Sequence, residues 1–176
     1  MSFTFEKLKI PDVILICNSV YTDNRGFFEE LYKYSEFRVN NITEYFRQEN
    51  YSYSKKNVIR GLHYQIGPNA QAKLVCCIHG EIFDVVVDVR KESPTKGQWI
   101  SVILSDKNHK QLYIPKGFAH GFCVLSQEAK VIYKCTKEYM PEIEKGIIWN
   151  DSTLKIGWPT TNPILSDKDL NNEGFI

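Results

Sequence analysis

Arg60, His63 and Gln65 lie within the short motif RGLHYQ (60–65) and are the side chains that first suggest chemistry. Side chains on a β-strand alternate between faces, so His63 and Gln65 would share one face of a strand here, and Leu62 and Tyr64 would pack on the other. An imidazole and an amide on one face are costly to bury unless they meet a ligand or a partner. The other interpretation is a solvated edge strand with one incidental histidine, and these residues alone do not decide between the two.

A second polar stretch, PKGFAHGF (115–122), carries His120 and resembles one half of the cupin pattern, P-x-G-x-x-H. In metal-binding cupins the other half supplies two histidines at H-x-H spacing and then a glutamate. Here Gln65 stands where the histidine after His63 would be needed. Two histidines without a carboxylate at the right spacing make a poor iron or zinc site, so we predict no metal centre.

Length, composition and charge limit the number of domains and the kinds of partner that this protein can have. The chain has 176 residues, of which 43% are apolar and 24% charged, and this fits one globular domain spanning 1–176. A net charge of +1 argues against a nucleic-acid or membrane-surface partner. The N-terminal residues show no signal-peptide pattern, and no apolar run is long enough to span a membrane.

The cysteines are odd in number and include no C-x-x-C pair. We therefore expect reduced, mostly buried thiols in a cytoplasmic protein, without a disulfide framework or a metal cluster. Cys76 and Cys77 are adjacent on a predicted strand, so their side chains should point to opposite faces. The cysteines are Cys17, Cys76, Cys77, Cys123 and Cys135.

Short β-like runs, separated by turns rich in Gly, Pro and Asn, recur along most of the chain. Roughly ten such runs at this spacing predict an all-β sandwich or barrel. Residues 82–89 are apolar nearly throughout, which predicts a central strand covered on both faces. The predicted strands are 13–16, 27–32, 45–52, 58–65, 73–78, 82–89, 99–104, 111–114, 121–125 and 130–136.

Turns and helices complete this prediction. His79-Gly80 is typical of a tight hairpin turn between two paired strands. Ser35 is a candidate N-cap for a short helix that ends near Asn41. The segment from Met140 onward contains prolines and little periodicity, so we expect an ordered wrap over the barrel that ends in a short helix.

Eight motifs taken in order resemble the nucleotide-sugar 3,5-epimerase family of the cupin superfamily, which includes the dTDP-4-dehydrorhamnose 3,5-epimerases. The resemblance runs from Asp23 to Asp169, and the series is far more specific than any one motif. The motifs are RGLHYQ (60–65), AKLV (72–75), GEIFDVVVDVR (80–90), SPTKGQW (93–99), IPKGFAHGF (114–122), YK (133–134), WND (149–151), and WP (158–159) running on to LSDKD (165–169).

The resemblance implies a cupin-type jelly roll (a double-stranded β-helix) with a few short helices, acting as a homodimer without a cofactor. The implied reaction inverts C3 and C5 of dTDP-4-dehydro-6-deoxy-D-glucose and gives dTDP-4-dehydro-L-rhamnose. Such a reaction removes a proton next to the C4 ketone and returns one to the opposite face. It therefore needs a base, an acid on the far side and positive charge near the enolate oxygen.

The residues at the family positions suit these tasks. An unperturbed imidazole titrates near ~6.5, so His63 suits the base, whereas the phenol of Tyr133, with a reference pKa of ~10, suits the acid. Lys73 would place an ammonium near the C4 oxygen. By the resemblance, Asp169 hydrogen-bonds the imidazole of His63 and fixes its tautomer.

The resemblance also implies a set of substrate-binding residues. Fixed cations suit a diphosphate, and an aromatic ring can stack on thymine, the role implied for Tyr139. Only the spacing from Arg25 selects Glu30 over Glu29. His79 and His109 match no family position and are interpreted as a turn residue and a surface residue. The implied residues are Arg25, Glu30, Gln48, Asn50, Arg60, Lys73, His120, Tyr139, Glu144 and Lys168.

Each of these side chains has a structural explanation when it is taken alone. His63 could be a core histidine, Tyr133 a strand tyrosine, Lys73 a solvated lysine and Asp169 a turn residue, and only their joint occurrence favours catalysis. Three alternatives stay open. They are a relative that inverts only C3 or C5 or uses another sugar or nucleotide, a metal-dependent cupin oxygenase, and a non-catalytic sugar-binding jelly roll.

Overall fold

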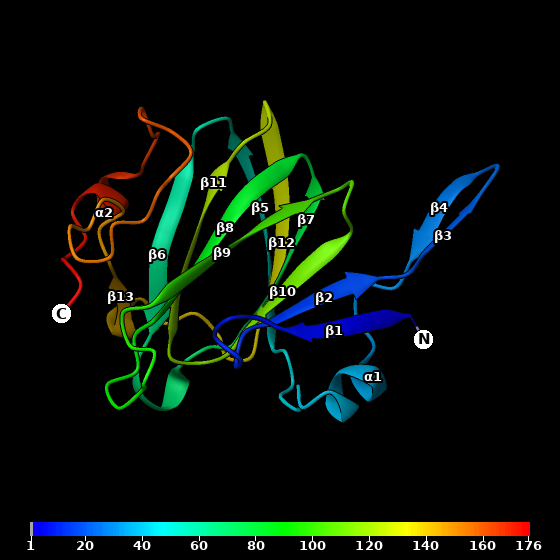
Figure 1. The fold of residues 1–176 in the computed structure, drawn as a ribbon, viewed down its shortest axis with the longest axis horizontal. Coiled ribbons are helices and arrows are strands. Elements are labelled where there is room, and N and C mark those ends of the chain that lie inside the picture. Colours follow the sequence, from blue (N-terminus) through cyan, green and yellow to red (C-terminus); the bar gives the residue numbers. More distant parts are fainter. Residues whose placement is uncertain (1) are drawn as a thin grey trace.

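The computed structural model describes residues 2–176, and two antiparallel sheets form its body (Figure 1). One sheet has six strands in the order β1-β2-β10-β7-β12-β5, the other has five in the order β13-β6-β11-β8-β9, and β3 and β4 pair separately. The strands are β1 (Phe3–Lys7), β2 (Ile14–Asn18), β3 (Val20–Asp23), β4 (Gly26–Glu29), β5 (Gln48–Lys55), β6 (Ile59–Gln65), β7 (Lys73–His79), β8 (Glu81–Asp88), β9 (Trp99–Ser105), β10 (Lys110–Ile114), β11 (Phe118–Val124), β12 (Glu128–Cys135) and β13 (Glu144–Gly146). The helices are α1 (Tyr34–Val39), α2 (Asp167–Leu170) and the 3-10 turns η1 (Gly67–Asn69) and η2 (Pro141–Ile143).

The chain passes back and forth between the two sheets, as a jelly roll requires. From β5 to β8 each successive strand lies in the opposite sheet, and the alternation resumes from β9 to β13. The all-β prediction is therefore confirmed. Within the described residues no helix is long and apolar enough to cross a membrane.

The main core fills the space between the sheets, where Val75 and Leu112 of one sheet pack with Val86 and Phe122 of the other. The neighbours Val85 and Val87 point to the opposite face of β8 and belong to a second buried cluster. That cluster includes Leu154, Trp158 and Phe175, so the C-terminal segment covers the outer face of the five-stranded sheet. The predictions of a doubly covered strand at 82–89 and of a C-terminal wrap are both confirmed.

The predicted hairpin at His79-Gly80 is wrong. Strand β7 belongs to the six-stranded sheet and β8 to the five-stranded sheet, so this turn carries the chain across the core. Gly80 has a φ of 77°, and a Cβ there would lie 2.1 Å from the carbonyl oxygen of Glu128. Two apolar strands can bury their faces by stacking across a core as well as by pairing side by side, and the turn residues did not distinguish these arrangements.

The predicted short helix is present as α1, but Ser35 does not cap it. Lys33 occupies the N-cap position, and no side chain there accepts a hydrogen bond from the first turn. Packing holds the helix instead, because the buried Phe37 meets the rings of Phe3 and Tyr32 edge-on at centroid distances of 5.2 and 4.8 Å. The expected C-terminal helix is α2, and here Ser166 is a true N-cap that accepts a hydrogen bond from the backbone N–H of Asp169.

Candidate active site

A polar groove opens between the two sheets and has two connected parts, an inner part of about 180 Å³ and an outer part of about 300 Å³. His63, Lys73 and Tyr133 line both parts, so we treat them as one cavity and call it the active-site groove. Strands of both sheets and helix α2 contribute to it. The groove also brings together the predicted residues Gln48, Asn50, Arg60, His120, Tyr139, Glu144, Lys168 and Asp169.

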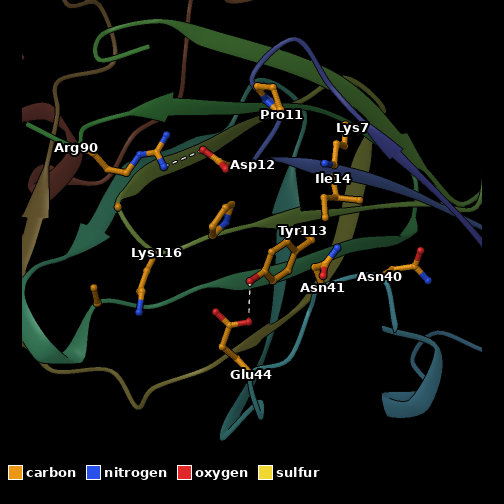
Figure 2. Close-up of a pocket in the computed structure, with 13 residues that line it drawn as sticks. Lys7, Pro11, Asp12, Ile14, Asn40, Asn41, Glu44, Arg90, Tyr113 and Lys116 are labelled. Carbon is orange, nitrogen blue, oxygen red and sulfur yellow. Dashed lines mark hydrogen bonds and ion pairs between the residues drawn. The ribbon is translucent and has the colours of Figure 1, made fainter. Parts of the chain in front are cut away.

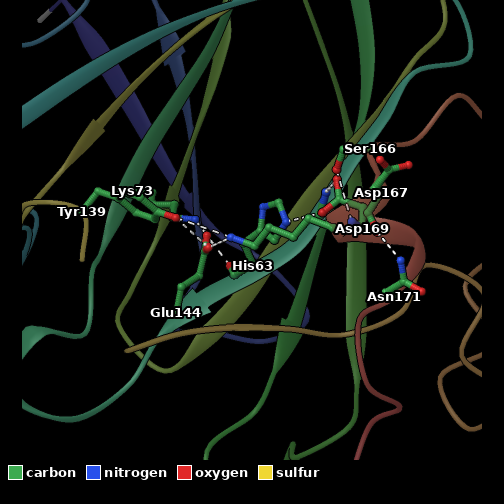
Figure 3. Close-up of polar contacts among 10 residues, drawn as sticks. His63, Lys73, Tyr139, Glu144, Ser166, Asp167, Asp169 and Asn171 are labelled. Atoms are coloured by element: carbon green, nitrogen blue, oxygen red, sulfur yellow. Dashed lines mark hydrogen bonds and ion pairs between the residues drawn. The ribbon is translucent and has the colours of Figure 1, made fainter. Parts of the chain in front are cut away.

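His63 and Asp169 form the shortest polar contact between side chains of the inner groove. His63 Nε2 and Asp169 Oδ1 are 2.5 Å apart (Figure 3). Burial by itself raises the pKa of Asp169, but the hydrogen bond with His63 and the interactions with other neighbouring groups together outweigh it and lower that pKa. An ionised Asp169 can only accept, so neutral His63 carries its proton on Nε2 and leaves Nδ1 free to take a proton.

Strand pairing fixes the position of this imidazole. His63 of β6 lies directly opposite His120 of β11, and the register shifts immediately afterwards, between His120 and Phe122. The side chains of Leu62 and Tyr64 pack into the cluster under the C-terminal segment, as predicted for the other face of β6. His63 therefore faces the groove because its two neighbours are anchored behind it.

Lys73 is a buried cation at the base of the groove. Its Nζ donates a hydrogen bond to the carbonyl oxygen of His63 at 3.4 Å, and burial lowers the pKa of its ammonium, against the attraction of Cys135 and Asp84. Because Lys73 is buried, water screens its charge only weakly, and a positive charge here would act strongly on an oxyanion in the groove.

Tyr133 lies on β12, opposite Asn50 of β5 and Val75 of β7. Burial is the largest effect on its phenol and raises the pKa, with a smaller contribution in the same direction from Cys135. The hydroxyl group therefore stays protonated at neutral pH. It is available as a proton donor.

Contacts at the outer part of the groove join α2 to the segment around β13. Lys168 Nζ donates to Glu144 Oε2, and Tyr139 Oη donates to the same oxygen at 3.0 Å (Figure 3). Lys168 Nζ also lies 3.4 Å from Tyr139 Oη. Since Asp169 follows Lys168, one short helix contacts both the imidazole and the aromatic ring.

Arg25 and Glu30 are not brought to the groove within one chain. Arg25 lies at the tip of the β3–β4 hairpin, which projects away from the sandwich (Figure 1), and its side chain is 86% exposed and paired with Asp23. Glu30 lines neither part of the groove. Its neighbour Glu29 accepts a hydrogen bond from Asn18 Nδ2 at 2.9 Å.

His109 is not the surface residue that the sequence suggested. Its side chain is largely buried, with Nδ1 3.2 Å from Glu29 Oε1 and its ring edge-on to Phe27.

Comparison with known proteins identifies the family of this chain. A family model described as dTDP-4-dehydrorhamnose 3,5-epimerase matches residues 7–175. The chain belongs to the dTDP-4-dehydrorhamnose 3,5-epimerase family. The enzyme of that name from Shigella flexneri is 52% identical over 172 residues, which cover 97% of this chain and 94% of that protein.

Solved structures of this epimerase family also share the fold. The Bacillus anthracis enzyme, solved with TDP and PPi bound, superposes with a TM-score of 0.95 at 44% identity and covers 98% of this chain and 99% of its own. The Legionella pneumophila enzyme, in complex with dTDP-4-keto-L-rhamnose, gives a TM-score of 0.95 at 45% identity, with coverages of 98% and 93%. The fold is the cupin-type jelly roll of the epimerase family.

Asp84, which was not predicted as a site residue, hydrogen-bonds the predicted binding residue His120. Asp84 Oδ2 lies 2.8 Å from His120 Nε2, while its Oδ1 has no hydrogen-bond partner among the described residues. A signal was present in the sequence, because Asp84 interrupts the apolar run of β8 and a buried carboxylate needs a partner. Cys135, Phe122, Gln71 and Ser166 also line the groove without having been predicted.

A separate cavity of about 570 Å³ lies beside the β1–β2 turn and has no such chemistry (Figure 2). Two polar contacts lie in it: Arg90 pairs with Asp12 at 2.8 Å, and Tyr113 Oη donates to Glu44 at 3.0 Å. Across the described residues, no group of three His, Cys, Asp or Glu side chains comes together as a metal site would require.

Replacing Gly61 with alanine should destabilise the protein at the pairing of β6 with β11. Gly61 has a φ of 127°, and a Cβ there would lie 2.5 Å from the Cα of Gly121, so β6 and β11 would have to separate. Strain and overpacking together should lower the free energy of unfolding by on the order of 3 kcal/mol, measured by urea denaturation. The exposed Gly157, whose Cβ would meet nothing within 4 Å, is the control. Equal stability of the two alanine variants would contradict this account.

Proposed function

We propose that this protein converts dTDP-4-dehydro-6-deoxy-D-glucose to dTDP-4-dehydro-L-rhamnose by inverting C3 and C5, and that residues 1–176 act as one domain. The observation that carries the proposal is that one groove contains the hydrogen-bonded pair His63–Asp169, the buried Lys73 and the phenol of Tyr133. Family membership and the sugar nucleotide in the Legionella relative support the choice of substrate.

In the proposed mechanism, Nδ1 of His63 removes the proton from the carbon next to the C4 ketone. The electron pair of the C–H bond moves onto the C4 oxygen, and the ammonium of Lys73 stabilises the resulting enolate. Tyr133 then donates a proton to the opposite face, and the ketone is restored. Each inversion breaks and re-forms one C–H bond without net oxidation or reduction, so we infer that no cofactor takes part.

Charge and aromatic surface in the rest of the groove support the way we propose the nucleotide binds. Arg60 lines the inner part, with its Nε donating to Ser54 Oγ at 2.9 Å, and His120 and Lys168 line the same part. We assign these three residues to the diphosphate. In the outer part, we assign Tyr139 to stacking on thymine, together with Gln48, Asn50 and Glu144 as polar contacts.

We infer further that two copies form a homodimer in which the β3–β4 hairpin of one reaches the groove of the other. The hairpin pairs with neither sheet, and Tyr21, Phe27 and Phe28 on it are exposed. A lone two-stranded hairpin is marginally stable in water, and an apolar surface of this kind is typical of an interface. This arrangement would bring Arg25 and Glu30 to the partner's substrate.

Co-expression of two inactive variants tests the shared site. A mixed dimer of His63→Asn and Arg25→Ala subunits would keep one intact site, made of the histidine of one chain and the arginine of the other. Random pairing makes half of the dimers mixed, so activity should recover to about a quarter of the wild-type value. Activity no higher than that of the better single variant would show that Arg25 does not act across an interface.

Turnover in heavy water tests the reaction itself. Deuterium at both C3 and C5 of the product is expected, because each carbon loses a proton and receives one from the solvent. Label at one carbon alone would identify a mono-epimerase instead, and the absence of any turnover would favour a sugar-binding protein.

Replacing Tyr133 with phenylalanine should separate proton removal from inversion. His63 can still form the enolate and can return a proton to the same face, so exchange of the C5 proton with solvent should stay within about tenfold of the wild-type rate. Net epimerisation should fall by roughly 10²-fold or more, because the acid on the opposite face is missing. Both rates are followed by NMR in heavy water, and equal losses of exchange and inversion would contradict the assignment of Tyr133.

A further inference from the structure

Gln65 is a buried amide to which the proposed reaction gives no role. It is 4% exposed and lines neither part of the active-site groove. Its Nε2 donates to the carbonyl oxygens of Asn69 at 2.8 Å and Glu138 at 3.3 Å, and its Oε1 accepts from the backbone N–H of Met140 at 2.7 Å. The side chain therefore uses both its donor and its acceptor on main-chain groups.

Two of these partners, Glu138 and Met140, are the residues on either side of Tyr139. The backbone N–H of Tyr139 itself donates to Gln48 Oε1 at 2.7 Å, and its hydroxyl group donates to Glu144 Oε2 at 3.0 Å. Glu144 is in turn the residue of β13 that pairs with Gln65 of β6. Segment 138–140 is thus fixed through its main chain, although the ring of Tyr139 is largely exposed.

We propose that Gln65 is a positioning residue for the nucleobase, acting by holding segment 138–140 so that the ring of Tyr139 is in place before the nucleotide binds. The proposal rests on the function proposed above, in which Tyr139 stacks on thymine. An aromatic platform that is already ordered binds more tightly, because the loop loses less conformational freedom on binding.

An amide is the side chain that these three partners require. The carbonyl groups of Asn69 and Glu138 need a donor, whereas the N–H of Met140 needs an acceptor. A glutamate would keep the shape and the acceptor but would turn a charged oxygen toward two carbonyl groups. Gln65→Glu is therefore a nearly isosteric change that should release the segment around Tyr139.

Gln65 lies on the same strand as His63, and this affects how the substrate is aligned. His63 and Gln65 are two residues apart on β6, and a strand rises about 3.3 Å per residue. The same strand therefore sets the spacing between the base that acts on the sugar and the support of the nucleobase platform. A flexible platform should weaken binding without changing the proton-transfer groups.

Titration calorimetry with two probes tests the proposal. Gln65→Glu should weaken the binding of dTDP by about tenfold and that of inorganic pyrophosphate by less than about twofold, since pyrophosphate carries no base that could stack on Tyr139. In steady-state kinetics KM should rise while kcat stays within about twofold. In a Tyr139→Ala background the same change should add less than about twofold to the loss of dTDP affinity.

Two further variants separate positioning from a loss of stability. Gln65→Met removes the hydrogen bonds without adding charge and should give the same split between dTDP and pyrophosphate, and it serves if Gln65→Glu fails to fold. Asn108→Asp makes the same amide-to-acid change on an amide that donates to the carbonyl oxygen of Ile103, in the turn that precedes β10, and should leave KM unchanged.

The outcomes distinguish this proposal from the function on which it rests. Equal losses for dTDP and pyrophosphate, or an undiminished effect of Gln65→Glu in the Tyr139→Ala background, would overturn the positioning role. If Tyr139→Ala weakens dTDP binding but both Gln65 variants bind normally, only the inference about Gln65 fails. If the wild-type protein does not bind dTDP, the proposed function fails first.

Discussion

Replacing His63 with asparagine is expected to lower kcat by roughly 10²–10⁴-fold, the range typical for loss of a general base. Asparagine can still meet Asp169 with its side-chain amide, so the groove should keep its shape, but the amide cannot accept a proton from carbon. We expect dTDP to bind with nearly wild-type affinity. Deuterium exchange at C5 should fall as far as net epimerisation, which sets this variant apart from Tyr133→Phe.

The measurement is a pair of NMR time courses in heavy water, with calorimetry for dTDP. His79→Asn provides the control, because His79 lies at the end of β7 and faces Asp106 and Glu128 outside the groove. A His63→Asn protein with exchange and epimerisation rates close to those of wild type would remove His63 from the mechanism.

Replacing Lys73 with methionine is expected to lower kcat by roughly 10²–10³-fold, the effect typical of removing one oxyanion donor. Methionine fills a similar volume and its apolar, flexible side chain tolerates burial, so the change removes the positive charge with little loss of packing. Without the ammonium, the negative charge that develops on the C4 oxygen is left without its nearest cation. Exchange at C5 should therefore fall along with epimerisation.

The Lys73→Met experiment needs a stability control, because Lys73 also interacts electrostatically with the buried Asp84. Thermal unfolding followed by circular dichroism shows whether the variant stays folded at the assay temperature. Lys107→Met, at an exposed position in the turn after β9, should leave both rates unchanged. Exchange at the wild-type rate in a folded Lys73→Met protein would mean that another group stabilises the enolate.

Much of the architecture could be predicted because the buried faces of a strand set a regular pattern of apolar residues in its sequence. The apolar run at β8 predicted a strand covered on both faces, and the alternation in β6 predicted that Leu62 and Tyr64 pack on the face opposite His63. Strands β1, β3 and β13 were not predicted. The three-residue β13 has no β-forming composition and exists because its backbone pairs with β6.

For the groove, too, the sequence predicted some features and not others. The types and order of His63, Lys73, Tyr133 and Asp169 were sufficient to predict general acid–base chemistry, since few other side chains can perform it near neutral pH. Sequence separation gave no information on which of them touch. His63 and Asp169 are 106 positions apart and meet because α2 packs against β6.

The amino-acid sequence by itself determined the strand pattern, the family and the set of groups able to move a proton, because these follow from local alternation and from residue chemistry. Only the tertiary structure decided that His79-Gly80 crosses between sheets, that Asp84 lies beneath His120, that Gln65 holds the segment around Tyr139, and that Arg25 lies away from its own groove. The physical reason is that these features depend on which distant segments pack together. Many weak contacts across the core together decide that packing, and they cannot be predicted from any single stretch of the sequence.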